Sequence, residues 1–225
     1  MTDPFRLNHE LPIGMQLTGW LRDQIVTGKM APGVRLSEQE IAKATGMSRQ
    51  PVREAFIKLS GEKLVEIRPQ RGTFVCKISM KDVMVSRFVR EAVEADIVTA
   101  AAQNASADHV SELQAAVAEQ HASRAMGGAV FMQLDEQFHR LLCLAAGQGA
   151  VWHHLEPIKM HMDRVRYLTA EQPPDHLIAQ HADIVDAIAA QDPARAEEAL
   201  RIHLRGVLKD LPELQIKAAA LFQDD

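Results

Sequence analysis

The chain has 225 residues, 47% of them hydrophobic, so it is long enough for one large or two small domains with a substantial core. No apolar run is long enough to span a membrane, and the N-terminus lacks the apolar core of a signal peptide. We therefore expect a cytoplasmic protein with no membrane partner. Cys76 and Cys143 are far apart and form no CxxC pair, which favours buried thiols over a disulfide.

The net charge of -5 is unevenly distributed along the chain. Residues 1–80 contain 12 Lys and Arg against 8 Asp and Glu, whereas residues 81–225 contain 13 against 22. A basic first third joined to an acidic remainder suggests that only the first part approaches a polyanion such as DNA.

The chain opens with an arm and a helix. Residues 1–12 have mixed polarity and two prolines, and we interpret them as a loose N-terminal arm. Across residues 13–27 the apolar side chains Leu17, Leu21 and Ile25 recur every four positions, which predicts an amphipathic helix.

Two short helices follow. Ser37 with Glu40 three residues later matches a capping box, and the helix that it opens runs to residue 44. A turn around Gly46 leads into the next helix, so the pair has the helix-turn-helix pattern. The predicted buried stripe of the second helix of this pair is Val52, Phe56 and Leu59.

Another face of that helix carries side chains suited to reading DNA. Arg49 and Arg53 are four residues apart, with Gln50 beside them. Arg and Gln make bidentate hydrogen bonds to guanine and adenine edges in a major groove. The alternative is an ordinary surface helix with two arginines, and the helices and hairpin around it favour the DNA-binding interpretation.

A hairpin is predicted directly after these helices. Residues 64–67 and 73–75 have the composition of short strands, and residues 69–72 form the turn between them. A hairpin in this position is a wing, and Arg71 and Gly72 at its tip are predicted to lie against the phosphate backbone or in a minor groove. Alternatively, Arg71 is a solvated turn residue.

From Ser79 onward only alanine-rich helical periodicity is found, with no strand candidate. Interruptions divide this part into six helices of roughly 20 residues, typical of an antiparallel bundle. They fall near residues 104–106, 127–128, 147–149, 172–174 and 192–193. The predicted fold is mainly α: an N-terminal winged helix-turn-helix domain and a C-terminal antiparallel six-helix bundle. The predicted ranges are 1–12 for the arm, 13–77 for the DNA-binding domain and 78–225 for the bundle.

Four polar side chains are predicted to meet inside the bundle. Asp135 and His139, at i and i+4, share one face of its third helix. His181 and His203 are each 11 residues from Asp192, the turn between the last two helices. Asp135 and His139 lie 13 and 9 residues before the turn at Gln148. In an alternating bundle this turn lies at the same end as the turn at Asp192, so all four side chains reach about the same depth. Three imidazoles and a carboxylate suit a divalent metal ion, Zn²⁺ or Ni²⁺ before others.

Other interpretations of these side chains stay open. A single histidine is most often a surface or hydrogen-bonded core residue, and His161 reaches a similar depth and competes for a ligand position. His153 and His154 lie nearer the bundle end, where we expect structural or exposed side chains. Arg90 lies roughly 6 Å deeper than the cluster, where it suits a carboxylate bridging it to the metal. Its alternative partner is Glu94, one turn on.

Two sets of residues resemble a known family. Residues 36–42 (LSEQEIA) and 47–55 (MSRQPVREA) resemble the winged-helix signature of GntR-type bacterial transcription regulators. The second part of the chain resembles the FCD ligand-binding domain of the FadR subfamily. The matching segments there are residues 89–94, 134–139, 181–188 and 203–204, and the resemblance covers about residues 12–212.

The resemblance implies a homodimer, built mainly through the C-terminal domain, that binds a short palindromic operator in double-stranded DNA. It implies a small organic acid as effector, and Arg90 matches an arginine that commonly faces it. Gln180 stands where relatives often carry an acidic residue, which leaves the ligand set intact. The metal ligands that it implies are Asp135, His139, His181 and His203.

The sequence therefore predicts an effector-responsive, sequence-specific transcription regulator, a repressor that a small carboxylate releases from its operator, and not an enzyme. The predicted base-reading residues are Arg49, Gln50 and Arg53. The predicted backbone contacts are Gln39, Ser48, Arg71 and Gly72. Two alternatives remain: a sensor whose metal is itself the signal, and a metal-dependent hydrolase with Glu94 or Glu136 as general base.

Overall fold

The computed structural model describes residues 3–169 and 175–223, so the predicted break at 172–174 lies outside the described residues. The chain forms two compact units, one from Met1–Met80 with Ala218–Asp225 and one from Lys81–Lys217. The predicted bundle domain, 78–225, differs from this division because the C-terminal segment belongs to the first unit. Among the described helices none is long and apolar enough to cross a bilayer.

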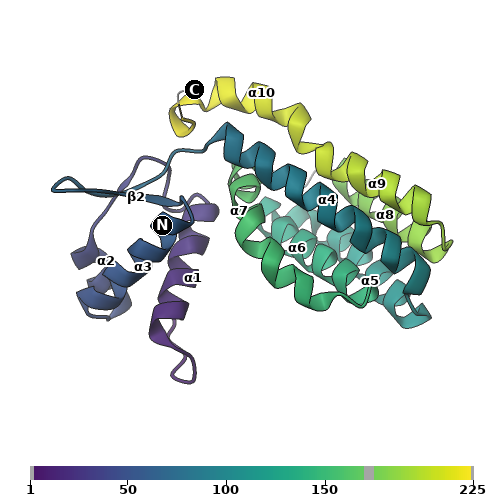
Figure 1. Cartoon of the computed structure of the whole chain (residues 1–225), viewed down its shortest axis with the longest axis horizontal. Helices are drawn as coiled ribbons and strands as arrows, with labels where there is room; N and C mark the ends of the chain where they lie inside the picture. The colour runs from purple at the N-terminus through teal and green to yellow at the C-terminus, as the bar shows by residue number, and fades with distance from the viewer. Residues whose placement is uncertain (1–2, 170–174, 224–225) are drawn as a thin grey trace. The chain divides into compact units, whose positions relative to one another are not determined.

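The first unit is a winged helix-turn-helix, as predicted (Figure 1). Its sheet has the antiparallel order β1-β3-β2, with Arg35 opposite Phe74 and Val65 opposite Val75. Strand β1 was not predicted, because two residues are too short to show an alternating pattern. The elements are α1 (Ile13–Val26), β1 (Arg35–Leu36), α2 (Glu38–Thr45), α3 (Arg49–Gly61), β2 (Val65–Arg68) and β3 (Gly72–Val75).

The predicted apolar stripes form the core of this unit. Helix α1 packs against α3. The stripe residues are at most 1% exposed. Because they are buried, the other face of α3 is turned to the solvent. The stripe residues are Leu17, Leu21, Ile25, Val52, Phe56 and Leu59.

The turn between α2 and α3 sets the direction of α3. The Ser37 hydroxyl accepts a hydrogen bond from the Glu40 backbone N–H at 3.3 Å and caps α2. Gly46 ends α2 in the left-handed region, with φ +69°, and its N–H donates to the Ala42 carbonyl. The chain therefore reverses within a few residues and starts α3 at Arg49.

The described part of the N-terminal arm, residues 3–12, is held against α1, so the prediction of a loose arm is wrong for these residues. The indole N–H of Trp20 donates to the Asp3 carbonyl at 3.1 Å, and the ring of Phe5 meets that of Trp20 edge-on. The C-terminal segment also belongs here, since Ile78 pairs with Phe222 in an isolated parallel bridge.

The second unit is entirely helical within its described residues, and it holds seven α-helices instead of the predicted six. The last predicted helix is interrupted at Gly206, whose N–H donates to the His203 carbonyl only three residues back. Glycine has a low helix propensity, so it suits this tightened turn. The helices are α4 (Met80–Asn104), α5 (Ala107–Ser123), α6 (Gly128–Ala145), α7 (Trp152–Thr169), α8 (Asp175–Ala189), α9 (Pro193–Arg205) and α10 (Val207–Lys217).

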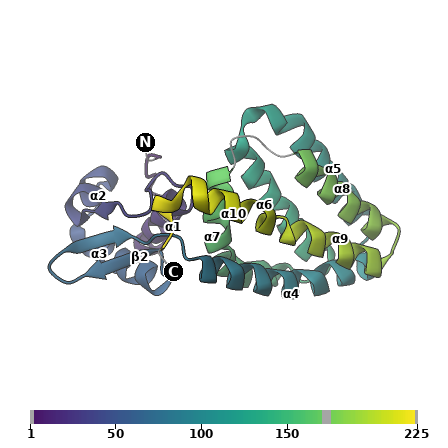
Figure 2. The same cartoon turned by 90° about the horizontal axis from the view of Figure 1, so that it is seen from above.

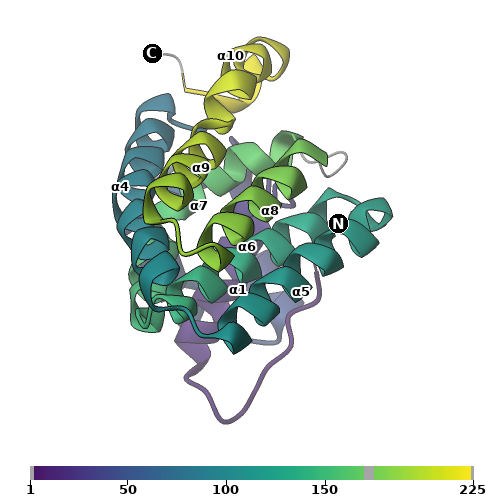
Figure 3. The same ribbon diagram turned by 90° about the vertical axis from the view of Figure 1, so that its right-hand side faces the viewer.

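The helices of this unit surround one apolar core. Helix α8 lies between α9 and α5 (Figure 3), and α4 runs beside α9 in two perpendicular views (Figures 1 and 2). Six helices supply fully buried core residues, so the polar side chains among them are also shielded from water. Examples are Val98, Leu113, Phe138, Trp152, Ile184 and Leu200.

Candidate functional site

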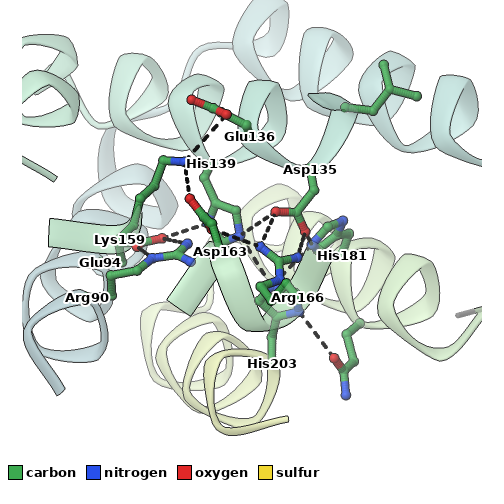
Figure 4. A network of polar contacts seen from close by, with 12 residues as sticks. Arg90, Glu94, Asp135, Glu136, His139, Lys159, Asp163, Arg166, His181 and His203 are labelled. Carbon is green, nitrogen blue, oxygen red and sulfur yellow. Dashed lines mark hydrogen bonds and ion pairs between the residues drawn. The ribbon is translucent and has the colours of Figure 1, made fainter. Parts of the chain in front are cut away.

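The helical unit brings together the four side chains predicted to converge. Helix α6 supplies Asp135 and His139, α8 supplies His181 and α9 supplies His203. One donor atom from each lies within 4.8 Å of the others, and every residue is at most 5% exposed (Figure 4). The depth argument from the bundle turns is therefore confirmed for their position, while their role as ligands stays a prediction.

The spacing of the ring nitrogens suits a metal ion. His203 Nε2 lies 3.2 Å from His139 Nε2 and 3.3 Å from His181 Nε2. Two nitrogens bound to one Zn²⁺ at about 2.0–2.1 Å with tetrahedral angles lie about 3.4 Å apart. Octahedral neighbours, typical of Ni²⁺, lie about 3.0 Å apart. The observed distances fall between these values, so they fit a divalent ion without selecting which one.

The other nitrogen of each ring faces an acceptor. His181 Nδ1 lies 2.7 Å from Gln120 Oε1, and the Gln120 amide is oriented because its Nε2 donates to the Leu134 carbonyl at 3.2 Å. His203 Nδ1 lies 3.2 Å from Gln180 Oε1. This contact uses the glutamine at the position where relatives often have an acid.

The third ring faces a carboxylate. His139 Nδ1 lies 2.6 Å from Glu94 Oε2, so this carboxylate faces the nitrogen, although the ring is poorly aligned for a hydrogen bond. A carboxylate and an amide oxygen only accept, so each Nδ1 carries the proton. Each Nε2 is then left with a lone pair that points into the cluster.

The protonation states strengthen this conclusion. Burial lowers the pKa of His181 to about 3 and the pKa of His203 well below its usual value, so both rings are neutral at pH 7. No proton remains to lie between these Nε2 atoms. Converging lone pairs without a donor repel one another, whereas a cation at their centre would bind all of them.

Asp135 is held as an anion beside the three rings. Burial favours its neutral form, but Arg166 outweighs burial and holds the pKa of Asp135 well below its usual value. Arg166 donates to both carboxylate oxygens, at 2.8 and 2.6 Å. This bidentate pair orients the carboxylate, whose oxygens lie 3.5 Å from His181 Nε2 and 4.0 Å from His139 Nε2.

A small cavity of about 10 Å³ adjoins the cluster. That is about the space that one water molecule needs. Arg90, Lys159 and Arg166 line it, together with Asp135, Asp163 and Glu136. Lys159 Nζ lies 2.6 Å from Asp163 and 3.4 Å from Glu136.

Arg90 makes the ion pair that sequence analysis gave as its alternative. Its Nε lies 2.6 Å from Glu94 Oε1, and both side chains are at most 3% exposed. Burial raises the pKa of Glu94, but Arg90 and His139 overcome it and lower that pKa to about 2. Arg90 also lines the cavity, so the ion pair leaves its predicted effector contact untested.

The remaining histidines stand apart from the cluster. His161 is half-buried in α7 and supplies no donor atom to the group of four. His153 and His154 are exposed, in keeping with the prediction for them.

The side chains that support this cluster were not predicted. Lys159, Asp163 and Arg166 lie at i, i+4 and i+7, so they share one face of α7. Charges at helical spacing between buried apolar residues were the available signal. Gln120 had no such signal, because its role comes only from the packing of α5 against α6 and α8.

The predicted base-reading residues lie together in the first unit. Arg49, Gln50 and Arg53 are exposed in the first turns of α3. Ser48, just before α3, and Gln39, in α2, are also exposed. The structure thus places these side chains on the surface of the helix-turn-helix, as a DNA-reading role requires. Their contacts with DNA stay a prediction.

Glu38 was not anticipated and connects the two arginines. Its carboxylate oxygens lie 3.2 Å from Arg49 Nη2 and 3.2 Å from Arg53 Nε. The glutamate side chain is 23% exposed, against 66% and 62% for the arginines. Glu38 therefore holds both guanidinium groups from the start of α2, a contact that only the tertiary fold brings about.

The wing has the expected tip. Arg71 is exposed, and Gly72 begins β3 with φ +109°. A Cβ at Gly72 would stand 2.8 Å from Arg35 Nε, so a larger residue would displace that side chain. The glycine keeps the Arg35 guanidinium close to the wing backbone.

Two family comparisons account for most of the chain. Residues 15–75 match the model for bacterial regulatory proteins of the gntR family, and residues 87–206 match the FCD domain. The chain belongs to the GntR family. Family membership makes this GntR protein a DNA-binding transcription regulator and not an enzyme. The hydrolase alternative is therefore wrong, and both of its proposed bases are engaged in ion pairs.

Named relatives agree with this assignment. The chain is 36% identical to the HTH-type transcriptional repressor RspR of Escherichia coli, covering 100% of both. It is 31% identical to a probable D-xylose utilization operon transcriptional repressor of Paenarthrobacter nicotinovorans, covering 87% of each. Among solved structures, E. coli McbR/YncC shares the fold with a TM-score of 0.77 at 19% identity, over 90% of this chain and 98% of that one.

Proposed function

We propose that this GntR regulator is a metal-containing repressor that leaves a palindromic operator when a small carboxylate binds its helical unit. The observation that carries the proposal is the convergence of three Nε2 lone pairs and the Asp135 carboxylate in a site shielded from water. When bound, the metal supplies a cationic centre that an effector carboxylate can coordinate. Asp135, His139, His181 and His203 would hold it.

Charge favours an anionic effector. Around the cavity three cations, Arg90, Lys159 and Arg166, contact three buried carboxylates, Glu94, Asp135 and Asp163. The charges of these six groups therefore cancel, and a bound divalent ion would give the site a net positive charge. An anion restores neutrality, and Arg90 and Lys159 are the cations placed to meet it.

The size of the cavity supports a structural response to the effector. A space of about 10 Å³ admits no organic acid unless lining side chains move. The ion pairs Arg90–Glu94 in α4 and Lys159–Asp163 in α7 are the contacts that an acid would rearrange. Binding would thus favour another arrangement of these helices, in which a dimer's recognition helices no longer fit the operator spacing.

Repression is proposed from the relatives. RspR and the regulator of D-xylose utilization are named repressors, and both align over most of this chain. We propose a homodimer in the cytoplasm, because a palindromic operator presents one half-site to each of two recognition helices. Arg49, Gln50 and Arg53 would read base edges, while Gln39, Ser48, Arg71 and Gly72 would contact the backbone.

The test is operator binding followed by fluorescence anisotropy, with a duplex selected from random DNA by the wild-type protein. Acetate, malate and citrate serve as probes, with Zn²⁺ at a fixed free concentration. At least one acid should weaken operator binding by wild type and not by His139→Ala or His203→Ala. If those variants lack metal and still respond normally, the metal does not anchor the effector.

The same assay separates a metal sensor from an effector-responsive regulator. In a titration of free Zn²⁺ without acid, a metal sensor changes its operator affinity across the titration. The proposed regulator changes little until acid is added. A response to Zn²⁺ alone that acid leaves unaltered would replace the proposal with the sensor.

A further inference from the structure

Strand β1 places an arginine beside the tip of the wing. Arg35 is exposed, and its backbone pairs with that of Phe74 in β3. Its side chain reaches along β3 toward the turn, because a Cβ at Gly72 would stand 2.8 Å from Arg35 Nε and 3.3 Å from Arg35 Nη2. The guanidinium group therefore lies directly against the backbone of Gly72.

This guanidinium group keeps its full charge. Among the described residues, no carboxylate lies within ion-pair distance of Arg35. Glu66 and Arg35 both pair with Phe74, so they share one face of the sheet. The glutamate, however, pairs with Arg68, whose Nη2 lies 2.7 Å from Glu66 Oε2. The N–H donors of Arg35 are therefore available to an anion from outside the chain.

Arg35 lies between two predicted DNA contacts. Three residues further along the chain, Glu38 of α2 contacts the base-reading Arg49 and Arg53. On the other side, the Arg35 guanidinium group touches Gly72, which is predicted to lie against the phosphate backbone. DNA that meets both α3 and the tip of the wing would thus pass close to Arg35.

We propose that Arg35 binds a phosphate of the operator backbone and that Gly72 seats its guanidinium group for this contact. A guanidinium group presents its donors in a planar fork that matches two phosphate oxygens. A phosphate is favoured over a base edge because Arg35 lies outside the recognition helix, against the wing backbone. The proposal rests on operator binding in the proposed function and is independent of the metal and the effector.

The salt dependence of DNA binding tests the phosphate contact. Arg35→Gln removes the charge and should lower the slope of log affinity against log salt concentration by about 1. Fluorescence anisotropy measures it on the selected duplex and on a scrambled one. Both duplexes should bind severalfold more weakly at an unchanged affinity ratio, because a phosphate carries no sequence information. Arg35→Lys should keep the wild-type slope but bind more weakly, because lysine retains the charge without the fork.

Arg68→Gln is the matched control. It removes the same charge from the same face of the sheet, but the Arg68 guanidinium group is already neutralised by Glu66. Its slope should therefore stay close to that of wild type. Urea unfolding should give the Arg35 variants the wild-type free energy of unfolding, because the side chain is exposed. A wild-type slope for Arg35→Gln, or a loss of affinity for the selected duplex alone, overturns the phosphate contact.

A double-mutant cycle tests the seat. Gly72→Ala should weaken DNA binding, but alanine is also strained there, because φ is +109°. The strain is the same with and without Arg35, so it cancels in the cycle. Gly72→Ala should therefore cost much less affinity when added to Arg35→Gln than when added to wild type.

Gly28→Ala is the control for backbone strain in this cycle. Gly28 also has a positive φ, +75°, and open space around it. Its effect on DNA binding should be equal in the wild-type and Arg35→Gln backgrounds. If Gly72→Ala also has equal effects in the two backgrounds, Gly72 does not seat Arg35 and that part of the proposal is overturned.

These outcomes are distinguishable from failure of the proposed function. If acid releases wild-type protein from its operator while Arg35→Gln keeps the wild-type slope, the phosphate contact is wrong and the function stands. If the slope falls as expected but acid never alters operator binding, the phosphate contact stands and the effector response fails.

Discussion

The proton on Nδ1 of each clustered histidine decides what the buried site can bind. Gln120, Gln180 and Glu94 each place an acceptor at that nitrogen, so the three Nε2 atoms present lone pairs to one another. Outer partners of this kind fix ring orientation and raise the basicity of the ligand. The acceptors should therefore affect metal affinity although they do not touch the metal.

Gln120→Leu tests this dependence. The leucine keeps a similar volume but offers no acceptor to His181 Nδ1, so Zn²⁺ affinity should fall about 10–100-fold. Competition with a chromophoric chelator measures it. Gln114→Leu, an exposed change on the same helix, should bind Zn²⁺ like wild type. Equal affinities in both variants would show that Gln120 does not orient the ring.

Arg49 should contribute base recognition and not merely charge. Arg49→Ala should weaken binding to the selected operator by about 1–3 kcal/mol and relax the base preference at one position. Lys58→Ala removes one exposed positive charge from the same helix and should weaken all sequences about equally. Unchanged affinity and footprint for Arg49→Ala would exclude the assigned role.

Glu38 should affect specificity through the two arginines that it contacts. Glu38→Gln removes the charge that holds Arg49 and Arg53, so the ratio of specific to non-specific affinity should fall severalfold. Glu40→Gln is the control, because it changes the net charge equally on the same turn of α2 at an exposed side chain. Anisotropy on selected and scrambled duplexes compares the two. Equal ratios would mean that Glu38 acts only through its charge.

Among single residues, the sequence could place those whose depth in the bundle follows from helix geometry. Asp135, His139, His181 and His203 could be placed at one depth because helix rise and turn positions are regular. Arg166 and Glu38 could not be assigned partners, because their contacts join segments 31 and 11 residues apart through tertiary packing. The spacing of residues in the sequence shows which side chains share a helix face, but not which other segments that face contacts.

At the scale of elements, the direction of α3 depends on the left-handed residue that ends α2. Gly46→Ala should destabilise the protein by about 1–2 kcal/mol, because a side chain at φ +69° is strained although the space around it is open. Gly61→Ala is the control: that glycine lies in α3 without positive φ and also has open space, so alanine should be neutral or slightly stabilising.

Urea unfolding measures both glycine variants. The free energy of unfolding should fall for Gly46→Ala alone, and operator affinity should fall with it because α3 enters at a different angle. Equal stability of the two variants would show that the turn tolerates a side chain at Gly46.

The same scale shows which elements a sequence can define. Helices with an apolar period between turn residues, such as α1, α2 and α8, began or ended within a few residues of the predicted positions. Strand β1 and the interruption at Gly206 were missed. The first exists only because β3 supplies its partner, and the second is one tightened turn within continuous helical periodicity.

At the scale of the whole molecule, the two units have different chemistry. The basic residues that face outward on α3 and the wing suit a polyanion, while the helical unit shields its charges in paired clusters. In the proposed dimer, two copies of each unit would be joined, so that a change at the buried site would reach both operator half-sites together.

The buried cluster of Asp135, His139, His181 and His203 is proposed to hold a metal ion. Native mass spectrometry of full-length protein, purified without chelator and supplied with one equivalent of Zn²⁺, tests it most directly. We predict one divalent ion per chain in wild type and in His153→Ala, whose histidine is 80% exposed at its side chain, and none in His203→Ala. Wild-type protein without metal, or His203→Ala with a full complement, would contradict the account.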